Sequence, residues 1–319
     1  MESFAGKLAV VTGGGSGMGR ELVRQLAAQG CSVAACDVNE PSVAETAALA
    51  RAGAQPDVLV SSHACDVADK AQVQRFRGAL LSEHASGRLD LVFANAGVGG
   101  GGSFVTGSRE QWERTFAIDW WGVYNCARAF LPLLIASEEG VLVNTSSVNG
   151  FWATLGPGNP HTAYSAAKFA VKGFSEALIE DLRVNAPHVR VAVVMPGHIG
   201  TDIVANSLRI LGHADPENMS DADLEALRPE LGRRFATAGA ATPEELRQIL
   251  VRANSEFRDS APLSAADAAT IILDGVRAGS WRILVGEDAK TLDAAVRARP
   301  EKAYDYAELF SPPPAAAGR

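Results

Sequence analysis

Short apolar runs alternate with amphipathic stretches along most of this chain. The first run, at residues 8–11, enters a glycine cluster, and Met18, Leu22 and Leu26 then recur at helical spacing. The alternation continues and predicts further strands at 33–37, 58–63, 89–94, 141–146, 189–195 and 283–285. Helices are expected at 41–52, 68–84 and 110–136, and from 162 onward. Because the strand runs are apolar on both faces, the pattern predicts an α/β fold with a doubly wound, Rossmann-type parallel sheet and helices on both of its faces.

No linker divides the 319 residues, and the pattern predicts one catalytic domain over residues 1–286. Within this domain, the segment at about 205–262 is polar with scattered apolar positions. We expect it to form an inserted helical flap over the substrate. Residues 287–319 are expected to form a C-terminal extension whose last, proline-rich part is disordered.

The composition points to a globular protein with a small-molecule partner. The chain is 47% hydrophobic and 21% charged, with a net charge of -8, a balance that argues against nucleic-acid and anionic-membrane partners. An acid, Glu2, stands where a secretion signal needs bases, and no run is apolar enough to cross a bilayer, so a cytoplasmic location is expected. The four cysteines lack metal-ligand spacing, which predicts buried free thiols and no metal.

A glycine-rich turn joins the first strand to the first helix. Backbone N–H groups and the helix dipole can hold a pyrophosphate at such a junction, and glycine lets the phosphates approach the backbone. A tight turn without a ligand is the alternative interpretation. The residues expected to bind a cofactor here are Gly13, Ser16, Gly17, Met18 and Gly19.

Asp37 ends the second strand 18 positions after Gly19 (37 minus 19). This spacing is close to the ~20 residues expected for an acid that hydrogen-bonds the adenosine ribose of a dinucleotide. A carboxylate would repel the additional phosphate of NADP, so the sequence favours NAD, with NADP less favoured. An ordinary turn residue is the alternative. Asp66 and Asn95 follow the next two strands, at the same edge of the sheet.

Tyr164 and Lys168 stand four residues apart on an expected helix and therefore share one face. An unperturbed tyrosine has a pKa of ~10, and a nearby ammonium lowers that pKa by favouring the phenolate. Ser147 follows another strand at the same sheet edge, where its hydroxyl can donate to a carbonyl oxygen that gains charge. The alternative is a tyrosine that packs on the aliphatic stem of a lysine.

These pieces occur together in one order: Thr12-Gly13-x-x-x-Gly17-x-Gly19, Cys65-Asp66-Val67, Asn95-Ala96-Gly97, Ser147, Tyr164-x-x-x-Lys168 and Pro196-Gly197-x-x-x-Thr201. In this order they resemble the short-chain dehydrogenase/reductase family over nearly the whole chain. The resemblance implies an NAD(P)-dependent enzyme in which Tyr164 exchanges a proton with the substrate oxygen and Ser147 orients that oxygen. It also implies that Lys168 tunes Tyr164 and binds the nicotinamide ribose.

The resemblance assigns further residues to the cofactor. Asp66 and Val67 would flank the adenine, and Asn95 would support the glycine turn. The segment after the sixth strand would hold the carboxamide. The remaining cofactor residues implied in this way are Ala96, Gly97, Tyr164, Pro196, Gly197, Ile199 and Thr201.

Asp119 departs from the family pattern, which usually has asparagine at this position. In the family the site kinks the helix and joins a water-linked proton relay to the lysine, largely through its main chain. An aspartate can keep the main-chain role and pair its charge with Lys168, so Asp119 is placed with the catalytic residues. A solvated helix carboxylate is the alternative.

The segment between Ser147 and Tyr164 is a few residues longer than is usual in the family, and we expect it to shape the substrate mouth. Apolar residues on the surrounding loops predict a pocket for a secondary alcohol or ketone with a bulky aromatic, terpenoid or steroid-like body. A core or subunit contact is the alternative for the same side chains. The predicted pocket residues are Val98, Phe104, Phe151, Trp152, His161, Ile203 and Leu208.

The resemblance also implies a homodimer or homotetramer assembled through the helices at 110–136 and 162–184. Two other functions remain open from the sequence. One is an NADP-dependent carbonyl reductase, which Asp37 disfavours. The other is a nicotinamide-sensing protein without catalysis, which would have little use for Ser147, Tyr164 and Lys168 together.

Overall fold

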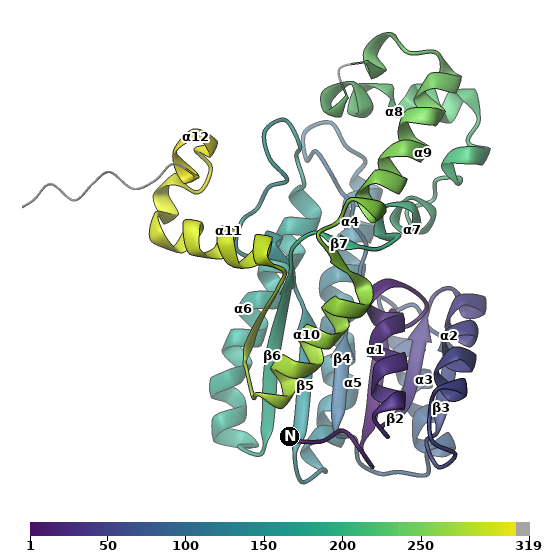
Figure 1. Ribbon diagram of the computed structural model, residues 1–319, viewed down its shortest axis with the longest axis vertical. Coiled ribbons are helices and arrows are strands. Elements are labelled where there is room, and N and C mark those ends of the chain that lie inside the picture. Colours follow the sequence, from purple (N-terminus) through teal and green to yellow (C-terminus); the bar gives the residue numbers. More distant parts are fainter. Residues whose placement is uncertain (236, 311–319) are drawn as a thin grey trace, which may run out of the picture.

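A parallel sheet forms the centre of the computed structural model, which describes residues 1–235 and 237–310 (Figure 1). Seven strands of the described residues form it, in the order β3-β2-β1-β4-β5-β6-β9. These strands are β1 (Leu8–Thr12), β2 (Ser32–Asp37), β3 (Val60–Ala64), β4 (Leu91–Ala94), β5 (Gly140–Thr145), β6 (Val189–Pro196) and β9 (Arg282–Val285). The predicted doubly wound sheet is confirmed. Strand order reverses between β1 and β4, and a ligand crevice is expected at such a point.

The central strands are buried along their whole length, which explains their continuous apolar sequences. Every residue of β1, β4 and β5 is buried. The edge strand β3 is mostly half-buried and carries serines and a histidine. In register, Val10 pairs with Ala34 on one side and with Val92 on the other.

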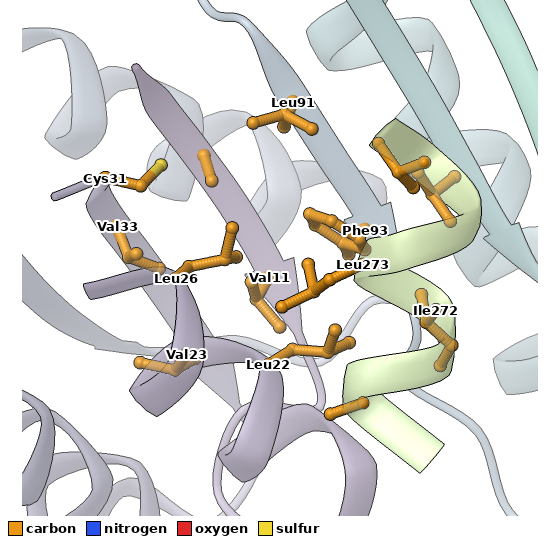
Figure 2. Packing of buried hydrophobic residues seen from close by; sticks show 14 of the residues in the cluster. Val11, Leu22, Val23, Leu26, Cys31, Val33, Leu91, Phe93, Ile272 and Leu273 are labelled. Carbon is orange, nitrogen blue, oxygen red and sulfur yellow. The ribbon is translucent and has the colours of Figure 1, made fainter. Parts of the chain in front are cut away.

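Three helices cover one face of the sheet: α1 (Gly17–Ala28), α2 (Glu40–Ala52) and α10 (Ala265–Arg277). Figure 2 shows Leu22 of α1 and Leu273 of α10 directed toward Val11 and Phe93 of the strands. Each of these four side chains is 1% exposed or less. Burial of one such side chain contributes about 1.5–3 kcal/mol, so this layer fixes α1 and the glycine turn that precedes it.

The opposite face carries α3 (Lys70–Glu83), α4 (Arg109–Phe116), α5 (Gly122–Ile135) and α6 (Thr162–Asn185). The single helix expected at 110–136 is interrupted, because a π-helical turn at Ala117–Trp121 separates α4 from α5. The turn contains Asp119, whose side chain is directed into the protein. Such turns frequently mark functional sites.

The four cysteines are buried and free, as expected from their spacing. Among the described residues, no helix combines the length and the apolar character that crossing a membrane requires.

The flap stands above the carboxyl edge of the sheet (Figure 1). It contains α7 (Ile203–Ile210), α8 (Asp221–Arg234) and α9 (Pro243–Asp259) and joins the sheet domain through a short pair of strands, β7 (Ile199–Gly200) and β8 (Leu263–Ser264). Capping boxes at Ser220 and Thr242 begin α8 and α9. The flap has an apolar cluster of its own, with Met219, Leu224, Leu231, Ala238, Leu246 and Leu250 buried.

The C-terminal extension packs on the loop that follows β5. It contains α11 (Glu287–Ala298) and α12 (Tyr306–Leu309). The Trp152 indole donates to the carbonyl oxygen of Ala303 at 2.6 Å, and the hydroxyls of Thr154 and Tyr306 lie 2.8 Å apart. The extension therefore supports the active-site side of the sheet. The disorder predicted for the proline-rich end concerns residues 311–319, which lie outside the described residues.

Candidate active site

The glycine turn lies against the ends of neighbouring strands with no room for side chains. Gly13 has a φ of +67°, and a Cβ there would lie 2.8 Å from Cα of Ala96. A Cβ on Gly19 would lie 1.9 Å from the carbonyl oxygen of Gly13. Only glycine fits these two positions, so backbone amides line the turn.

Asn95 and Thr12 connect the turn to β4. The backbone N–H of Asn95 donates to Oγ1 of Thr12 at 3.0 Å, and its side-chain amide donates to the Thr12 carbonyl at 3.2 Å. Asn95 thus contacts the turn as the family resemblance implies.

Asp37 lies beside the turn with both carboxylate oxygens engaged. One oxygen accepts from the backbone N–H of Gly15 and the other from that of Asn39, each at 2.9 Å. The carboxylate is thereby held at a fixed position at the end of β2. Such a position suits an acid that accepts hydrogen bonds from a ribose.

A cavity of about 600 Å³ runs along the carboxyl edge of the sheet. Asp37 and Asp66 lie on its wall, together with the glycine turn, and the flap closes it from the other side. This volume, the amide-lined turn and the fixed acid fit a dinucleotide. The predicted cofactor residues on its wall are Gly13, Ser16, Gly17, Met18, Gly19, Asp37, Asp66, Val67, Asn95, Ala96, Gly97 and Thr201.

Five of the predicted cofactor residues do not line this cavity: Tyr164 and Lys168 of α6, and Pro196, Gly197 and Ile199 at and after the end of β6. Pro196 and Ile199 are buried, Ile199 in the core under α1 and α10. Gly197 lies against the C-terminal extension, because a Cβ there would come within 2.2 Å of the Asp288 carboxylate. That carboxylate accepts from the N–H of His198 at 2.7 Å. Asp288 therefore fixes this segment, a role that nothing in the local sequence indicates.

Lys168 and Asp119 form a buried ion pair. Nζ of Lys168 lies 3.0 Å from Oδ1 of Asp119 and donates to the carbonyl oxygen of Thr145 at 3.2 Å. The two side chains are 3% and 0% exposed. Oδ1 of Asp119 also accepts from the N–H of Val98 at 3.2 Å, whereas its Oδ2 has no partner among the described residues. The solvated-carboxylate interpretation of Asp119 is therefore wrong.

Gly97 connects this pair to the cavity. It lies on the cavity wall, and a Cβ at this position would come within 2.6 Å of Oδ1 of Asp119 and 3.2 Å of Nζ of Lys168. The ion pair thus lies directly behind the backbone that lines the cofactor cavity.

Tyr164 is half-buried, and Nζ of Lys168 lies 5.3 Å from its ring centre. Burial is the largest effect and raises the pKa of Tyr164 above its ordinary value, and the Asp119 charge also raises it. Lys168 and a hydrogen bond with Ser147 act to lower this pKa. Lys168 therefore acts in the predicted direction, but burial outweighs it. Burial acts to lower the pKa of Lys168, but Asp119 and Tyr164 raise it above the ordinary value. Burial raises the pKa of Asp119, although Lys168 and the N–H of Val98 act to lower it. Because Nζ of Lys168 lies 3.0 Å from Oδ1 of Asp119, we assign the pair as ionised.

Ser147 is placed by the end of β5 and by a short 3₁₀ turn, Val148–Gly150. Its hydroxyl accepts from the N–H of Asn149 at 3.1 Å. The neighbouring Ser146 donates to the carbonyl oxygen of Lys168 at 2.7 Å and so anchors α6 to the strand end. This hydrogen bond fixes the end of β5 against α6, so that Ser147 lies beside Tyr164.

The predicted substrate residues fall into separate groups. Val98 and Ile203 line the cavity, and the His161 ring lies 4.6 Å from that of Tyr164. Phe104 is 74% exposed and contacts Trp112 edge to face. Two others pack on the C-terminal extension and one on the flap cluster: Phe151, Trp152 and Leu208. Their role toward a substrate stays a prediction.

Several contacts of the site have no local sequence signal. Arg114 of α4 forms a 2.6 Å ion pair with Asp66, 48 residues earlier. Ser207 of α7 accepts from the N–H of Gly99 at 2.7 Å and so connects the flap to the loop after β4. Long-range pairs of this kind become visible only once the elements are assembled.

A family model described as short chain dehydrogenase matches residues 7–209. The chain is 36% identical over 298 residues to the protein named SadH of Mycobacterium tuberculosis, covering 93% of this chain and 92% of that one. It is 30% identical over 280 residues to levodione reductase of Leifsonia aquatica, covering 87% and 96% of the two chains.

Solved structures share the fold. A short-chain dehydrogenase/reductase of Burkholderia phymatum in complex with NAD aligns with a TM-score of 0.74 and 30% identity, covering 98% of this chain and 99% of that one. A metagenomic short-chain oxidoreductase in complex with NADP aligns with a TM-score of 0.54 and 31% identity, over 61% and 83% of the two chains. Structural neighbours therefore include proteins with either dinucleotide.

The charge of Asp119 generates a prediction about pH dependence. Because that charge raises the pKa of Tyr164, Asp119→Asn is expected to lower it and to move the rising limb of kcat/KM for alcohol oxidation toward lower pH. The measurement is a pH–rate profile. Asp90→Asn, which alters a buried carboxylate at the start of β4, is the control and should leave the limb in place. A limb that stays in place or moves to higher pH would contradict the assigned effect of the Asp119 charge on Tyr164.

Proposed function

The chain belongs to the short-chain dehydrogenase/reductase family, and on that premise we propose that it interconverts a secondary alcohol and a ketone with NAD, through Tyr164. The observation that carries this proposal is the buried Lys168–Asp119 pair beside Tyr164, separated from the cofactor cavity only by Gly97. The pair supports the proposal because it lies near the Tyr164 ring and behind the wall of the cavity in which a nicotinamide would lie.

In the direction of oxidation, the phenolate oxygen of Tyr164 accepts the hydroxyl proton of the alcohol as hydride leaves the carbinol carbon. A bound nicotinamide dinucleotide supplies the hydride acceptor, and in the reverse direction the donor. The Ser147 hydroxyl donates to the substrate oxygen and stabilises charge on it. In reduction, the Tyr164 hydroxyl returns its proton to that oxygen.

Lys168 stabilises the phenolate through its charge, and Asp119 raises the pKa of that buried lysine. The carbonyl of Thr145 and the N–H of Val98 hold the pair from both sides. The pair is therefore fixed before any ligand arrives, as preorganised catalysis requires.

The preference for NAD over NADP rests on Asp37. Its carboxylate is fixed at the end of β2 by two backbone amides, and it lies on the cavity wall. Arg20, which also lies on the wall, is paired with Glu45 at 2.6 Å. A 2′-phosphate placed near Asp37 would meet a negative charge without a free cation beside it, which disfavours NADP.

A bulky hydrophobic alcohol or ketone is the substrate class we favour. Val98, Ile118, Ile203 and Ile210 supply apolar wall to the cavity on its flap side. The flap places α7 over this wall, so an apolar substrate would be covered as the flap packs down.

Removal of the Tyr164 hydroxyl tests the reaction. Tyr164→Phe is expected to lower kcat about 10²–10⁴-fold on a panel of aromatic, terpenoid and steroid alcohols and ketones, with NAD binding unchanged. Reduced-nicotinamide absorbance measures the rate, and calorimetry measures binding. Leu59→Ala, an exposed change before the edge strand β3 and outside the cavity wall, is the control. A parent protein that binds NAD but turns over none of the panel would favour a sensing role, and turnover confined to small polar polyols would overturn the substrate class.

Removal of the Asp37 charge tests the cofactor preference. Asp37→Ala is expected to reduce the ratio of kcat/KM for NAD to kcat/KM for NADP by about 10–100-fold. The substitution removes the acceptor for the ribose hydroxyls of NAD and the charge that repels the 2′-phosphate of NADP. Steady-state rates with both dinucleotides give the ratio. A parent protein that already prefers NADP would identify it as an NADP-dependent carbonyl reductase.

Assembly as a homodimer or homotetramer is proposed through α5 and α6. Aromatic side chains gather there: Trp120 contacts Phe174 edge to face, and Trp121 and Phe169 are 48% and 41% exposed. Exposed aromatic groups of this kind are enriched at interfaces.

The subunit contact is tested with Trp121→Glu and Phe169→Glu. Each places a charge in the proposed interface and is expected to lower the mass measured by light scattering to that of a smaller assembly. Phe104→Glu, at a 74% exposed position elsewhere, should leave the mass unchanged. A parent protein with monomer mass would rule out the assembly.

A further inference from the structure

Arginines contribute positive charge to the wall of the cofactor cavity, and among the described residues four of them lie there. Three are already paired with carboxylates. These pairs are Arg20 with Glu45 at 2.6 Å, Arg114 with Asp66 at 2.6 Å and Arg258 with Asp202 at 3.1 Å. Their charges are largely satisfied within the protein.

The fourth, Arg209 of α7, differs from the other three. It is exposed, and one of its terminal nitrogens donates to Oδ1 of Asn206 at 2.6 Å. Within residues 1–235 and 237–310 no carboxylate forms an ion pair with it. Arg209 therefore presents an uncompensated guanidinium to the cavity.

Asn206 connects this guanidinium to the glycine turn. Its side-chain N–H donates to Oγ of Ser16 at 3.2 Å, while its Oδ1 accepts from Arg209. Ser16 is the residue before α1, and its side chain makes no capping hydrogen bond. The first turn of α1 contains no acidic residue. The amides at the start of this helix are thus open to an anion, and Arg209 lies on the flap side of the same cavity.

We propose that Arg209, held by Asn206, binds the pyrophosphate of the dinucleotide from the flap side, opposite the amides of the glycine turn. A guanidinium matches phosphate oxygens in two-point geometry, and a dinucleotide pyrophosphate carries two negative charges. This inference rests on the proposed dinucleotide-dependent function and extends it. The flap then closes in response to the cofactor and not only to the substrate.

The test measures ligand affinity by calorimetry and does not depend on turnover. Arg209→Ala is expected to weaken NAD and ADP-ribose, which both carry the pyrophosphate, about tenfold, and to leave adenosine unchanged. Arg209→Lys keeps the charge but loses the two-point geometry, so an intermediate loss is expected. The loss should shrink at high salt.

The matched control is Arg252→Ala, which removes the same charge from exposed flap surface on α9 outside the cavity. Thermal melting confirms that each variant is folded. The positioning role of Asn206 is tested by a double-mutant cycle: Asn206→Ala should weaken ADP-ribose less than Arg209→Ala, and the two losses should not add.

Two results would overturn the proposal. The first is an Arg209→Ala protein that binds ADP-ribose as tightly as the Arg252→Ala protein does. The second is an equal loss of adenosine binding, which would indicate a general distortion of the cavity. Failure of the proposed function would give a different result from failure of the Arg209 proposal. A parent protein that binds ADP-ribose through Arg209 but oxidises no alcohol would support the Arg209 site and contradict the enzymatic function.

Discussion

The 3.0 Å ion pair between Lys168 and Asp119 is buried, so the surrounding structure has to supply hydrogen-bond partners and room for two charges. Two opposite charges without water cost several kcal/mol each to desolvate, and only close, well-oriented partners offset that cost. The end of β5 supplies the Thr145 carbonyl, and the loop after β4 supplies the Val98 amide. The π-helical turn brings Asp119 inward, and Gly97 leaves the room that the pair occupies. The end of β5, the loop after β4, the π-helical turn and α6, which carries Lys168, thus converge on one contact.

The same contact explains why aspartate is tolerated where the family usually has asparagine. A carboxylate here adds a charge that counters the effect of Lys168 on Tyr164, and its Oδ2 is left without a partner among the described residues. The resulting phenol is less acidic than a lysine neighbour alone would make it. The proton affinity of Tyr164 is therefore set by its burial and by a pair of charges rather than by burial and one charge.

Local signals predicted the strands, the glycine turn and the Tyr164–Lys168 spacing, because a periodic pattern or a four-residue interval is contained within one element. The apolar spacing at 110–136 continues through the π-helical turn and does not indicate it, and only the family resemblance implied a kink at Asp119. The burial of Asp119 also has no local signal, because a helix carboxylate is ordinarily solvated. Trp152 contacts Ala303, 151 residues later, and the pairing state of Arg209 depends on where every nearby carboxylate lies. Such contacts depend on residues that are distant in sequence and meet only in the folded protein.

The C-terminal extension has a consequence for the order in which contacts form during synthesis. Strands β1 to β6 are made before residue 197, whereas the Trp152 indole and the His198 amide find their partners at Ala303 and Asp288. Until residues 288 and 303 have been made, the loop after Ser147 and the segment after β6 lack these contacts. The central strands can therefore pair before the extension fixes the loops at their carboxyl ends.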